Sequence, residues 1–195
     1  MIFCLIPAKP YTEAKSRLSS VLSQAQRADL SRRLLRRTLR LALAVVEQVV
    51  VVSRDRDLLR QATALGAGGL LEESPGLNPA LNQAARFAQA RGAQGLLVLP
   101  ADLPRLTRRN LQTILSLASA CPAVVIAPCR HGTGTNALLL RPPGLIPFSF
   151  GPDSLSAHCA AARAAGVEPI IYRDERVAFD LDTPEDWEIG KLGDW

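Results

Sequence analysis

The sequence predicts a three-layer α/β protein built on a mainly parallel β-sheet. Short apolar runs, such as Ile2–Ile6 and Gln48–Ser53, alternate with amphipathic stretches of helical length. This alternation is typical of parallel strands joined by crossover helices. In the last third, closely spaced strand signals indicate antiparallel strands at the sheet edge. The chain has 195 residues, of which 48% are hydrophobic, so we assign residues 1–195 to one domain with a large core.

The elements of the first half follow from local signals. Pro7 ends the first apolar run, and a polar loop leads to Ser19. A leucine and valine repeat at intervals of four and seven predicts an amphipathic helix over Gln24–Val46. Asn78 and Pro79 suit the N-cap and first turn of a helix. We expect further strands at Gln48–Ser53 and Leu70–Leu71, and helices from Asp55 or Asp57 to Leu65 and over Asn78–Arg91.

The second half contains shorter elements. A strand over Gly95–Pro100 precedes a helix over Thr107–Ala120, which begins at a threonine N-cap. Thr183 and Pro184 are the expected cap and first residue of the last helix. The remaining expected elements are strands at Ala123–Pro128, Thr135–Leu140, Pro169–Tyr172 and Val177–Asp180, and a helix at Ser154–Gly166.

The composition excludes several classes of protein. The apolar runs are far shorter than the roughly 20 residues of a membrane span, and no basic segment precedes Ile2–Ile6 as in a signal peptide. The four cysteines form no Cys-x-x-Cys pair, which favours a reduced, cytoplasmic protein without structural zinc. The sequence leaves the oligomeric state open, a homodimer included.

The net charge of +5 is unevenly distributed. Most arginines of the long helix over Gln24–Val46 fall on its outer face, without the interleaved aromatic residues that stack on bases. We therefore expect a solvated helix face and no nucleic-acid partner. Lys9 and Lys15, in contrast, both lie in the first loop, although the chain uses arginine almost everywhere else.

That first loop is a candidate triphosphate site. Lys9, Lys15 and Arg17 place three cations after the first strand, where they could neutralise phosphate charge. The spacing of a P-loop is absent. A solvated loop with incidental cations is the alternative.

Three aspartates are candidate metal ligands. Asp102 follows a buried strand and stands between Pro100 and Pro104, a rigid position for an Mg²⁺ ligand, although it could also cap a turn. Asp180 and Asp182 alternate along an expected strand end and share one face. One of them could complete the metal site with Asp102 while the other caps the last helix, and the sequence does not decide between them.

Two further segments suit an anionic ligand. Thr135 and Asn136 follow a glycine-rich turn that offers hydroxyl and amide groups, although such a turn also occurs without a ligand. Gly151 and Ser154 lead into a helix whose first free N–H groups could cradle a phosphate. His158 lies four residues after Ser154, but no nucleophile elbow surrounds the serine, which disfavours a hydrolase.

Taken together and in this order, the segments resemble the guanylyltransferases of coenzyme F(420) biosynthesis. The resemblance runs from Ile2 to Trp187. It is carried by Pro7-Ala8-Lys9-Pro10, Ala14-Lys15-Ser16-Arg17-Leu18-Ser19, Gly76-Leu77-Asn78-x-Ala80-Leu81, Leu99-Pro100-x-Asp102-Leu103-Pro104, Gly134-Thr135-Asn136, Phe150-Gly151-Pro152-x-Ser154 and Asp180-Leu181-Asp182-Thr183-Pro184-Glu185-Asp186. Some relatives carry Thr at the place of Asn136 and Gly at the place of Asp153.

The resemblance implies a GT-A-like nucleotidyltransferase fold and a reaction of GTP with phosphoenolpyruvate or 2-phospho-L-lactate that releases pyrophosphate and uses Mg²⁺. It implies that Lys15 and Arg17 hold the triphosphate, with Lys9 nearby, and that the loop with Asn78 faces the nucleoside. The implied metal ligands are Asp102 with Asp180 or Asp182. The implied acceptor site consists of Thr135 or Asn136, Gly151 and Ser154.

Phosphoenolpyruvate is the favoured acceptor because the Arg- and Ala-rich composition looks bacterial; 3-phosphoglycerate also fits these motifs. Two other functions compete with this one. A molybdopterin-type nucleotidyltransferase would carry a glycine-rich first loop, which Pro7–Arg17 does not. A nucleotide-binding α/β domain without catalysis would bind GTP without releasing pyrophosphate.

Overall fold

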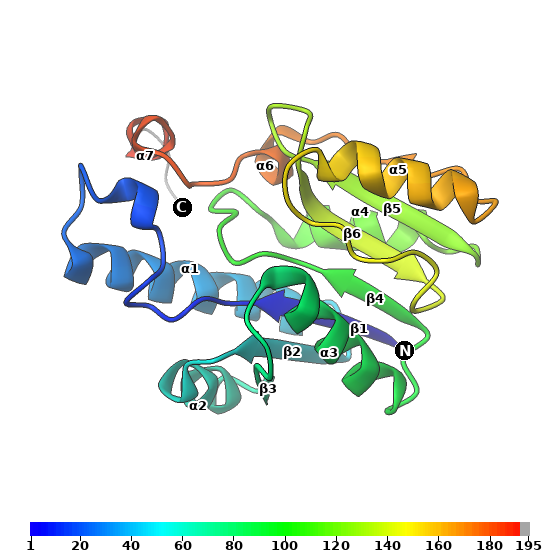
Figure 1. The fold of residues 1–195 in the computed structure, drawn as a ribbon, viewed down its shortest axis with the longest axis horizontal. Helices are drawn as coiled ribbons and strands as arrows, with labels where there is room; N and C mark the ends of the chain where they lie inside the picture. Colours follow the sequence, from blue (N-terminus) through cyan, green and yellow to red (C-terminus); the bar gives the residue numbers. More distant parts are fainter. Residues whose placement is uncertain (192–195) are drawn as a thin grey trace.

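The structure is a computed structural model that describes residues 1–191, and its centre is a seven-stranded sheet (Figure 1). The strand order is β3-β2-β1-β4-β6-β5-β7. β1 to β4 run parallel, β6 is antiparallel to both neighbours, and β7 is parallel to β5. The α/β class and the mainly parallel sheet are confirmed. The strands are β1 (Ile2–Pro7), β2 (Gln48–Ser53), β3 (Gly68–Leu71), β4 (Gly95–Val98), β5 (Ala123–Pro128), β6 (Thr135–Arg141) and β7 (Ile170–Ile171).

Helices cover both faces of the sheet, as expected for three layers. Cys4 and Ile6 of β1 pack in one core cluster with leucines of α1, α2 and α4, whereas Phe3 and Leu5 face a second cluster with α3 and α5. In Figure 1, α3 and α5 lie in front of the sheet and α4 behind it. The helices are α1 (Gln24–Leu43), α2 (Arg56–Ala64), α3 (Leu77–Gln89), α4 (Arg108–Leu117), α5 (Ser154–Ala164), α6 (Glu175–Ala178) and α7 (Pro184–Lys191), with the 3-10 turn η1 (Ser16–Leu18) after β1.

The direction of β6 decides what lies at the ligand-binding edge of the sheet. The parallel strands all end at one edge, and ligands of open α/β sheets bind beyond such ends. Because β6 runs the opposite way, its first residues, Thr135 and Asn136, lie at this same edge. Pro128 at the end of β5 pairs with Thr135. Segments far apart in the sequence thus meet at one edge.

Two expectations about the last third need correction. The antiparallel strand β6 lies inside the sheet between β4 and β5, and the edge strand β7 is parallel to its neighbour. The strand expected at Val177–Asp180 is wrong, because Glu175–Ala178 form helix α6 with Asp174 as N-cap. The carbonyls of Val177 and Ala178 accept bonds from the Asn136 side chain, and the Ala178 carbonyl also accepts one from the backbone N–H of Arg130 at 2.9 Å.

The helix caps agree with the sequence at several ends and differ at one. Asp55 and Thr107 accept bonds from the first N–H groups of α2 and α4, as expected. Thr183 likewise accepts a bond from the N–H of Asp186 at the start of α7. Asn78 as an N-cap is wrong, since Gly76 takes that position with φ 115° and α3 begins at Leu77.

The arginines of α1 form a solvated face only in part. Arg33, Arg36 and Arg40 are exposed, as expected. Arg37 instead donates to the carbonyl of Leu106 at 2.7 Å. Arg32 lies over the ring of Tyr11, with its guanidinium carbon 4.9 Å from the ring centroid.

None of the helices within residues 1–191 has the length and apolarity that crossing a bilayer requires.

Candidate active site

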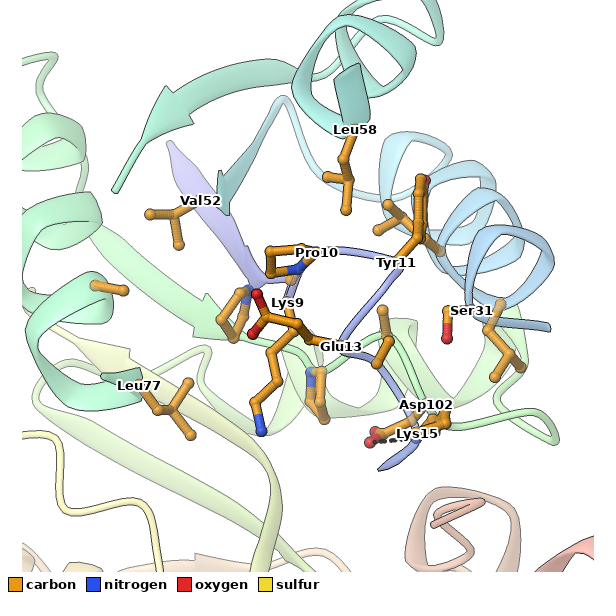
Figure 2. A pocket seen from close by; sticks show the side chains of 18 of the residues that line it. Lys9, Pro10, Tyr11, Glu13, Lys15, Ser31, Val52, Leu58, Leu77 and Asp102 are labelled. Atoms are coloured by element: carbon orange, nitrogen blue, oxygen red, sulfur yellow. Dashed lines mark hydrogen bonds and ion pairs between the residues drawn. The ribbon is translucent and has the colours of Figure 1, made fainter. Parts of the chain in front are cut away.

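A cavity of about 870 Å³ opens at the carboxyl ends of the parallel strands (Figure 2). Its volume lies within the roughly 300–1,000 Å³ of small-molecule sites. One part is apolar, with Val52, Leu77 and Ala80 in its wall. Many of the predicted site residues also line it, namely Lys9, Lys15, Arg17, Asp102, Thr135, Asn136 and Asp182.

The loop after β1 holds Lys15 in an unusual backbone conformation. The N–H groups of Glu13 and Ala14 donate to the carbonyl of Pro10 at 2.9 and 3.0 Å, which forms a compact turn. Lys15 then adopts left-handed angles, φ 55° and ψ 37°. A residue with a Cβ keeps such angles where its surroundings hold it. The fully buried Leu18 anchors the next turn, and the Lys15 side chain is only 8% exposed.

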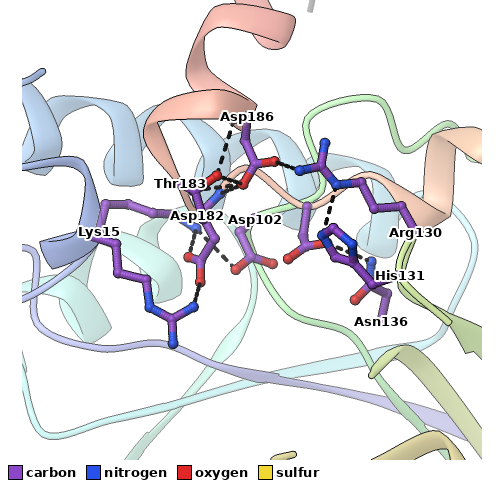
Figure 3. Close-up of polar contacts among 10 residues, drawn as sticks. Lys15, Asp102, Arg130, His131, Asn136, Asp182, Thr183 and Asp186 are labelled. Carbon is purple, nitrogen blue, oxygen red and sulfur yellow. Dashed lines mark hydrogen bonds and ion pairs between the residues drawn. The ribbon is translucent and has the colours of Figure 1, made fainter. Parts of the chain in front are cut away.

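Lys15 lies between two of the predicted metal ligands (Figure 3). Its Nζ is 3.0 Å from Oδ2 of Asp102 and 3.2 Å from Oδ1 of Asp182. Burial lowers the pKa of Lys15, but the two carboxylates outweigh burial, so its pKa lies above the ordinary value. Arg17 is 72% exposed and its Nη1 lies 3.2 Å from Oδ2 of Asp182. The predicted cations and carboxylates therefore form one charged cluster.

Asp180 completes an acidic group around Asp102. The N–H of Leu181 donates to the carbonyl of Asp102 at 3.0 Å and holds the two segments together. Burial raises the pKa of Asp180, and the negative charge of Asp102 raises it further. Asp182 lines the cavity, whereas Asp180 is not among its lining residues. Since Thr183 caps α7, neither aspartate has the capping role that the sequence left open.

The side chains as they stand do not form a preassembled metal centre. Within residues 1–191, no group of three or more His, Cys, Asp and Glu side chains is arranged to hold a metal ion. The cation that Asp102 and Asp182 share is the ammonium group of Lys15.

Asp186 fixes the backbone that carries Asp182, a role that sequence reasoning missed. Its Oδ2 accepts bonds from the N–H groups of Asp182 and Thr183, at 2.9 and 2.7 Å, and from the Thr183 hydroxyl at 2.9 Å. Burial raises the pKa of Asp186, but these donors and Arg130 lower it more, so the carboxylate is favoured. The Thr183-x-x-Asp186 spacing is a capping-box signal that could have revealed this role.

The two residues at the start of β6 have different partners. Thr135 Oγ1 lies 3.0 Å from Nδ1 of the buried His158. The Asn136 amide donates to the carbonyls of Val177 and Ala178 at 3.0 and 3.1 Å, and its nitrogen lies 3.4 Å from Oδ1 of Asp180. Asn136 therefore braces the segment that carries the aspartates.

The expected phosphate cradle at α5 differs from its sequence-based description. The N–H groups of Ser154 and Leu155 are not free, since they donate to the carbonyls of Gly151 and Thr133 at 3.3 and 2.9 Å. Ser154 is 2% exposed, and neither it nor Gly151 is among the residues that line the cavity. A Cβ on Gly151 would meet no other atom of the protein within 4 Å, and its φ of 143° is a backbone conformation that favours glycine. The first two N–H groups of α5 are therefore engaged by the protein's own carbonyls, and a ligand role for Ser154 and Gly151 stays a prediction.

Asn78 is likewise engaged within the protein. Its amide nitrogen donates to the carbonyl of Phe150 at 3.0 Å, and its amide oxygen accepts from the N–H of Phe150 at 2.9 Å. This reciprocal pair ties the start of α3 to the segment before α5. Gly76 and Leu77, next to Asn78, do line the cavity.

Comparison with known proteins shows the family of this chain. A family model described as "Guanylyl transferase CofC like" matches residues 2–191. The chain is 46% identical to phosphoenolpyruvate guanylyltransferase from Rubrobacter xylanophilus, over 95% of this chain and 91% of the relative. It is 36% identical to 2-phospho-L-lactate guanylyltransferase from Methanothermobacter thermautotrophicus, over 93% of this chain and 80% of the relative.

The fold has neighbours among solved structures. A protein from Desulfovibrio desulfuricans G20, proposed to be a nucleotide-diphospho-sugar transferase, matches with a TM-score of 0.78 and 20% identity, over 96% of this chain and 85% of that one. This confirms the expected GT-A-like nucleotidyltransferase fold. Because the family model and the relatives cover nearly the whole chain, they disfavour the molybdopterin-type enzyme and the domain without catalysis. The chain belongs to the CofC-like guanylyl transferase family and is a nucleotidyltransferase.

Proposed function

We propose that this chain transfers GMP from GTP to phosphoenolpyruvate and releases pyrophosphate. The observation that carries the proposal is the meeting of Asp102, Asp182 and Lys15 in one cavity at the strand ends. Lys15 could exchange the carboxylates for phosphate, and the carboxylates could exchange Lys15 for a metal ion. Such a cluster suits a substrate rich in phosphate. The relative of 46% identity is named for phosphoenolpyruvate, which favours this acceptor over 2-phospho-L-lactate.

The chemistry needs no protein nucleophile. An oxygen of the acceptor phosphate attacks the α-phosphorus of GTP, and the bond from that phosphorus to the bridging oxygen of the β-phosphate breaks. Pyrophosphate leaves with the electron pair of that bond. Such a transfer depends on positioning and charge neutralisation. Lys9, Lys15 and Arg17 line the cavity as cations for the triphosphate.

We propose Mg²⁺ as the cofactor, held by Asp102 with Asp182 or Asp180. The donor set fits, because carboxylate oxygens are ligands of Mg²⁺ and because two of these carboxylates already share one cation. When bound, Mg²⁺ would neutralise and orient phosphate oxygens. Lys15 would then leave the carboxylates, and its ammonium group would become available to the triphosphate.

The two substrates would occupy different ends of the cavity. We assign the nucleoside to the apolar part near Val52, Leu77 and Ala80, and the acceptor to the side of Thr135 and Asn136. The α-phosphate of GTP would then lie between them, beside Asp102. This arrangement agrees with the sequence-based roles of the first loop and of the start of β6.

The test is pyrophosphate release from GTP with each acceptor in turn. We expect release with phosphoenolpyruvate in the presence of Mg²⁺, and less with 2-phospho-L-lactate or 3-phosphoglycerate. ATP in place of GTP and EDTA in place of Mg²⁺ are the controls. No release with any of the three acceptors would refute the proposed reaction, and release with 2-phospho-L-lactate alone would refute the acceptor.

A further inference from the structure

We propose that His158 is a positioning residue that directs the hydroxyl proton of Thr135 into the cavity, so that Thr135 donates a hydrogen bond to the anionic acceptor. This inference rests on the proposed function, which supplies the acceptor. It concerns a histidine that is fully buried and that the transfer reaction itself does not use.

The two neighbours of the imidazole determine its tautomer. The backbone N–H of Ser149 can only donate, and it lies 3.1 Å from Nε2 of His158. Nε2 is therefore the acceptor, and the proton of the neutral ring is on Nδ1. Nδ1 lies 3.0 Å from Thr135 Oγ1 and donates to it.

The proton on His158 Nδ1 in turn orients the threonine. With one lone pair of Oγ1 occupied by this bond, the hydroxyl proton of Thr135 points elsewhere. Within residues 1–191, His158 is the hydrogen-bond partner of this hydroxyl, and Thr135 lines the cavity. The free direction of the hydroxyl is thus available as a donor to a ligand, and a phosphate or carboxylate oxygen is an acceptor that suits it.

The surroundings keep the ring neutral and fixed. Burial lowers the pKa of His158 to about 4, so the ring is uncharged near neutral pH. The ring of Phe150 packs edge-on against it with 4.9 Å between centroids. Phe150 is itself held through both backbone groups by Asn78. A chain of contacts from α3 through α5 to β6 therefore holds the hydroxyl.

A double-mutant cycle on acceptor binding tests the inference. Isothermal titration with phosphoenolpyruvate and Mg²⁺, and separately with GTP, compares His158→Phe, Thr135→Val and the double variant with the wild type. We expect each single variant to weaken phosphoenolpyruvate binding by about tenfold, the value of one hydrogen bond to a charged group, with GTP binding within about twofold. The double variant should be no weaker than Thr135→Val alone, and Thr135→Ser should retain binding.

The other outcomes would overturn the inference on His158, the proposed reaction, or both. Additive losses, or equal losses of GTP and acceptor binding, would mean that His158 acts only as a core residue. Ser156→Ala, an exposed change on the same helix, is the control, and His158→Leu replaces His158→Phe if that variant does not fold. Binding that follows the expected cycle without pyrophosphate release would refute the proposed reaction alone. If the wild type binds none of phosphoenolpyruvate, 2-phospho-L-lactate and 3-phosphoglycerate, both statements are refuted.

Discussion

At the scale of single residues, a lysine that bridges two carboxylates has to move before a divalent cation can take its place. Lys15 holds Asp102 and Asp182 at 3.0 and 3.2 Å, and its side chain is 8% exposed. Without a metal, it prevents repulsion between these carboxylates. If Mg²⁺ binds as proposed, the charge of Lys15 would become available to phosphate. Lys15 would then couple metal binding to nucleotide binding.

This exchange predicts tighter metal binding when the lysine is removed. In Lys15→Met the carboxylates lose their internal cation, so Mg²⁺ or Mn²⁺ should bind at least about tenfold more tightly without nucleotide, because two neighbouring carboxylates without a cation repel each other and a metal ion relieves this repulsion. Calorimetry with Mg²⁺, or electron paramagnetic resonance with Mn²⁺, measures the affinity. Lys9→Met removes the same charge from an exposed position of the loop and should leave it unchanged. Equal affinities of Lys15→Met and the wild type would contradict the exchange.

Asp102 should be essential for turnover and dispensable for folding. Asp102→Asn removes one carboxylate of the proposed Mg²⁺ site, and we expect pyrophosphate release to fall by at least about 100-fold at saturating Mg²⁺. The Asp102 side chain is 29% exposed, and in this variant Lys15 keeps its ion pair with Asp182. The circular dichroism spectrum and the melting temperature should therefore change little. Asp29→Asn, an exposed change on α1, is the control. Pyrophosphate release by Asp102→Asn near the wild-type rate would show that Asp102 has no role in the reaction.

His158 should make the stability of the protein depend on pH. Its pKa is about 4 in the folded state because of burial and near 6.5 when exposed. The unfolded chain therefore binds the proton first as the pH falls, so stability is complete above pH 6.5 and decreases toward pH 4, by up to about 3 kcal/mol. Urea unfolding at several pH values measures the slope. His158→Phe should flatten it in this range, and an unchanged slope would contradict the assignment.

At the scale of elements, local signals predicted most of the boundaries. Asp55, Thr107 and Thr183 cap helices because their side chains accept N–H groups a few residues later, which the sequence alone specifies. Asn78 resembles an N-cap in the sequence, but its side chain forms two hydrogen bonds with the backbone of Phe150, 72 residues later. The segment around Val177 is apolar like a strand, yet the side-chain amide of Asn136 donates a hydrogen bond to the carbonyl of Val177. Contacts between distant residues override local preference in both places.

The start of α5 and the start of β6 are two candidate binding sites for the acceptor. Ser154 is buried and the first N–H groups of α5 donate to carbonyls of the protein, whereas Thr135 lines the cavity. We expect Thr135→Val to raise the acceptor KM by about tenfold and Ser154→Ala to raise it by less than about threefold. Steady-state kinetics with varied phosphoenolpyruvate at saturating GTP measures both. A larger effect of Ser154→Ala would return Ser154 to the acceptor site, where the family resemblance implies it together with Thr135 or Asn136 and Gly151.

At the scale of the whole molecule, the site depends on the order of the strands. Its residues come from the first loop, the ends of β2 and β4, the start of α3, the start of β6 and the segment before α7. All of these except the end of β2 were recognisable by a motif of their own. Their meeting depends on β6 lying inside the sheet in the reverse direction, between β4 and β5. Strand order is a property of long-range pairing, so periodicity and caps predicted the strands without predicting this order. The pairing of Lys15 with the aspartates was hidden for the same reason, since 87 residues separate it from Asp102.

The net charge of +5 raises the question of whether total charge or its placement attracts the nucleotide. Arg17→Ala and Arg40→Ala lower the net charge by the same amount, but Arg17 lines the cavity and Arg40 is exposed on α1. We expect Arg17→Ala to raise the GTP KM by about three- to tenfold, a modest change because Arg17 is 72% exposed and its interactions are screened by solvent. Arg40→Ala should leave the KM within experimental error. Pyrophosphate release at two salt concentrations measures both variants, and equal changes would mean that GTP responds to net charge rather than to the cations of the first loop.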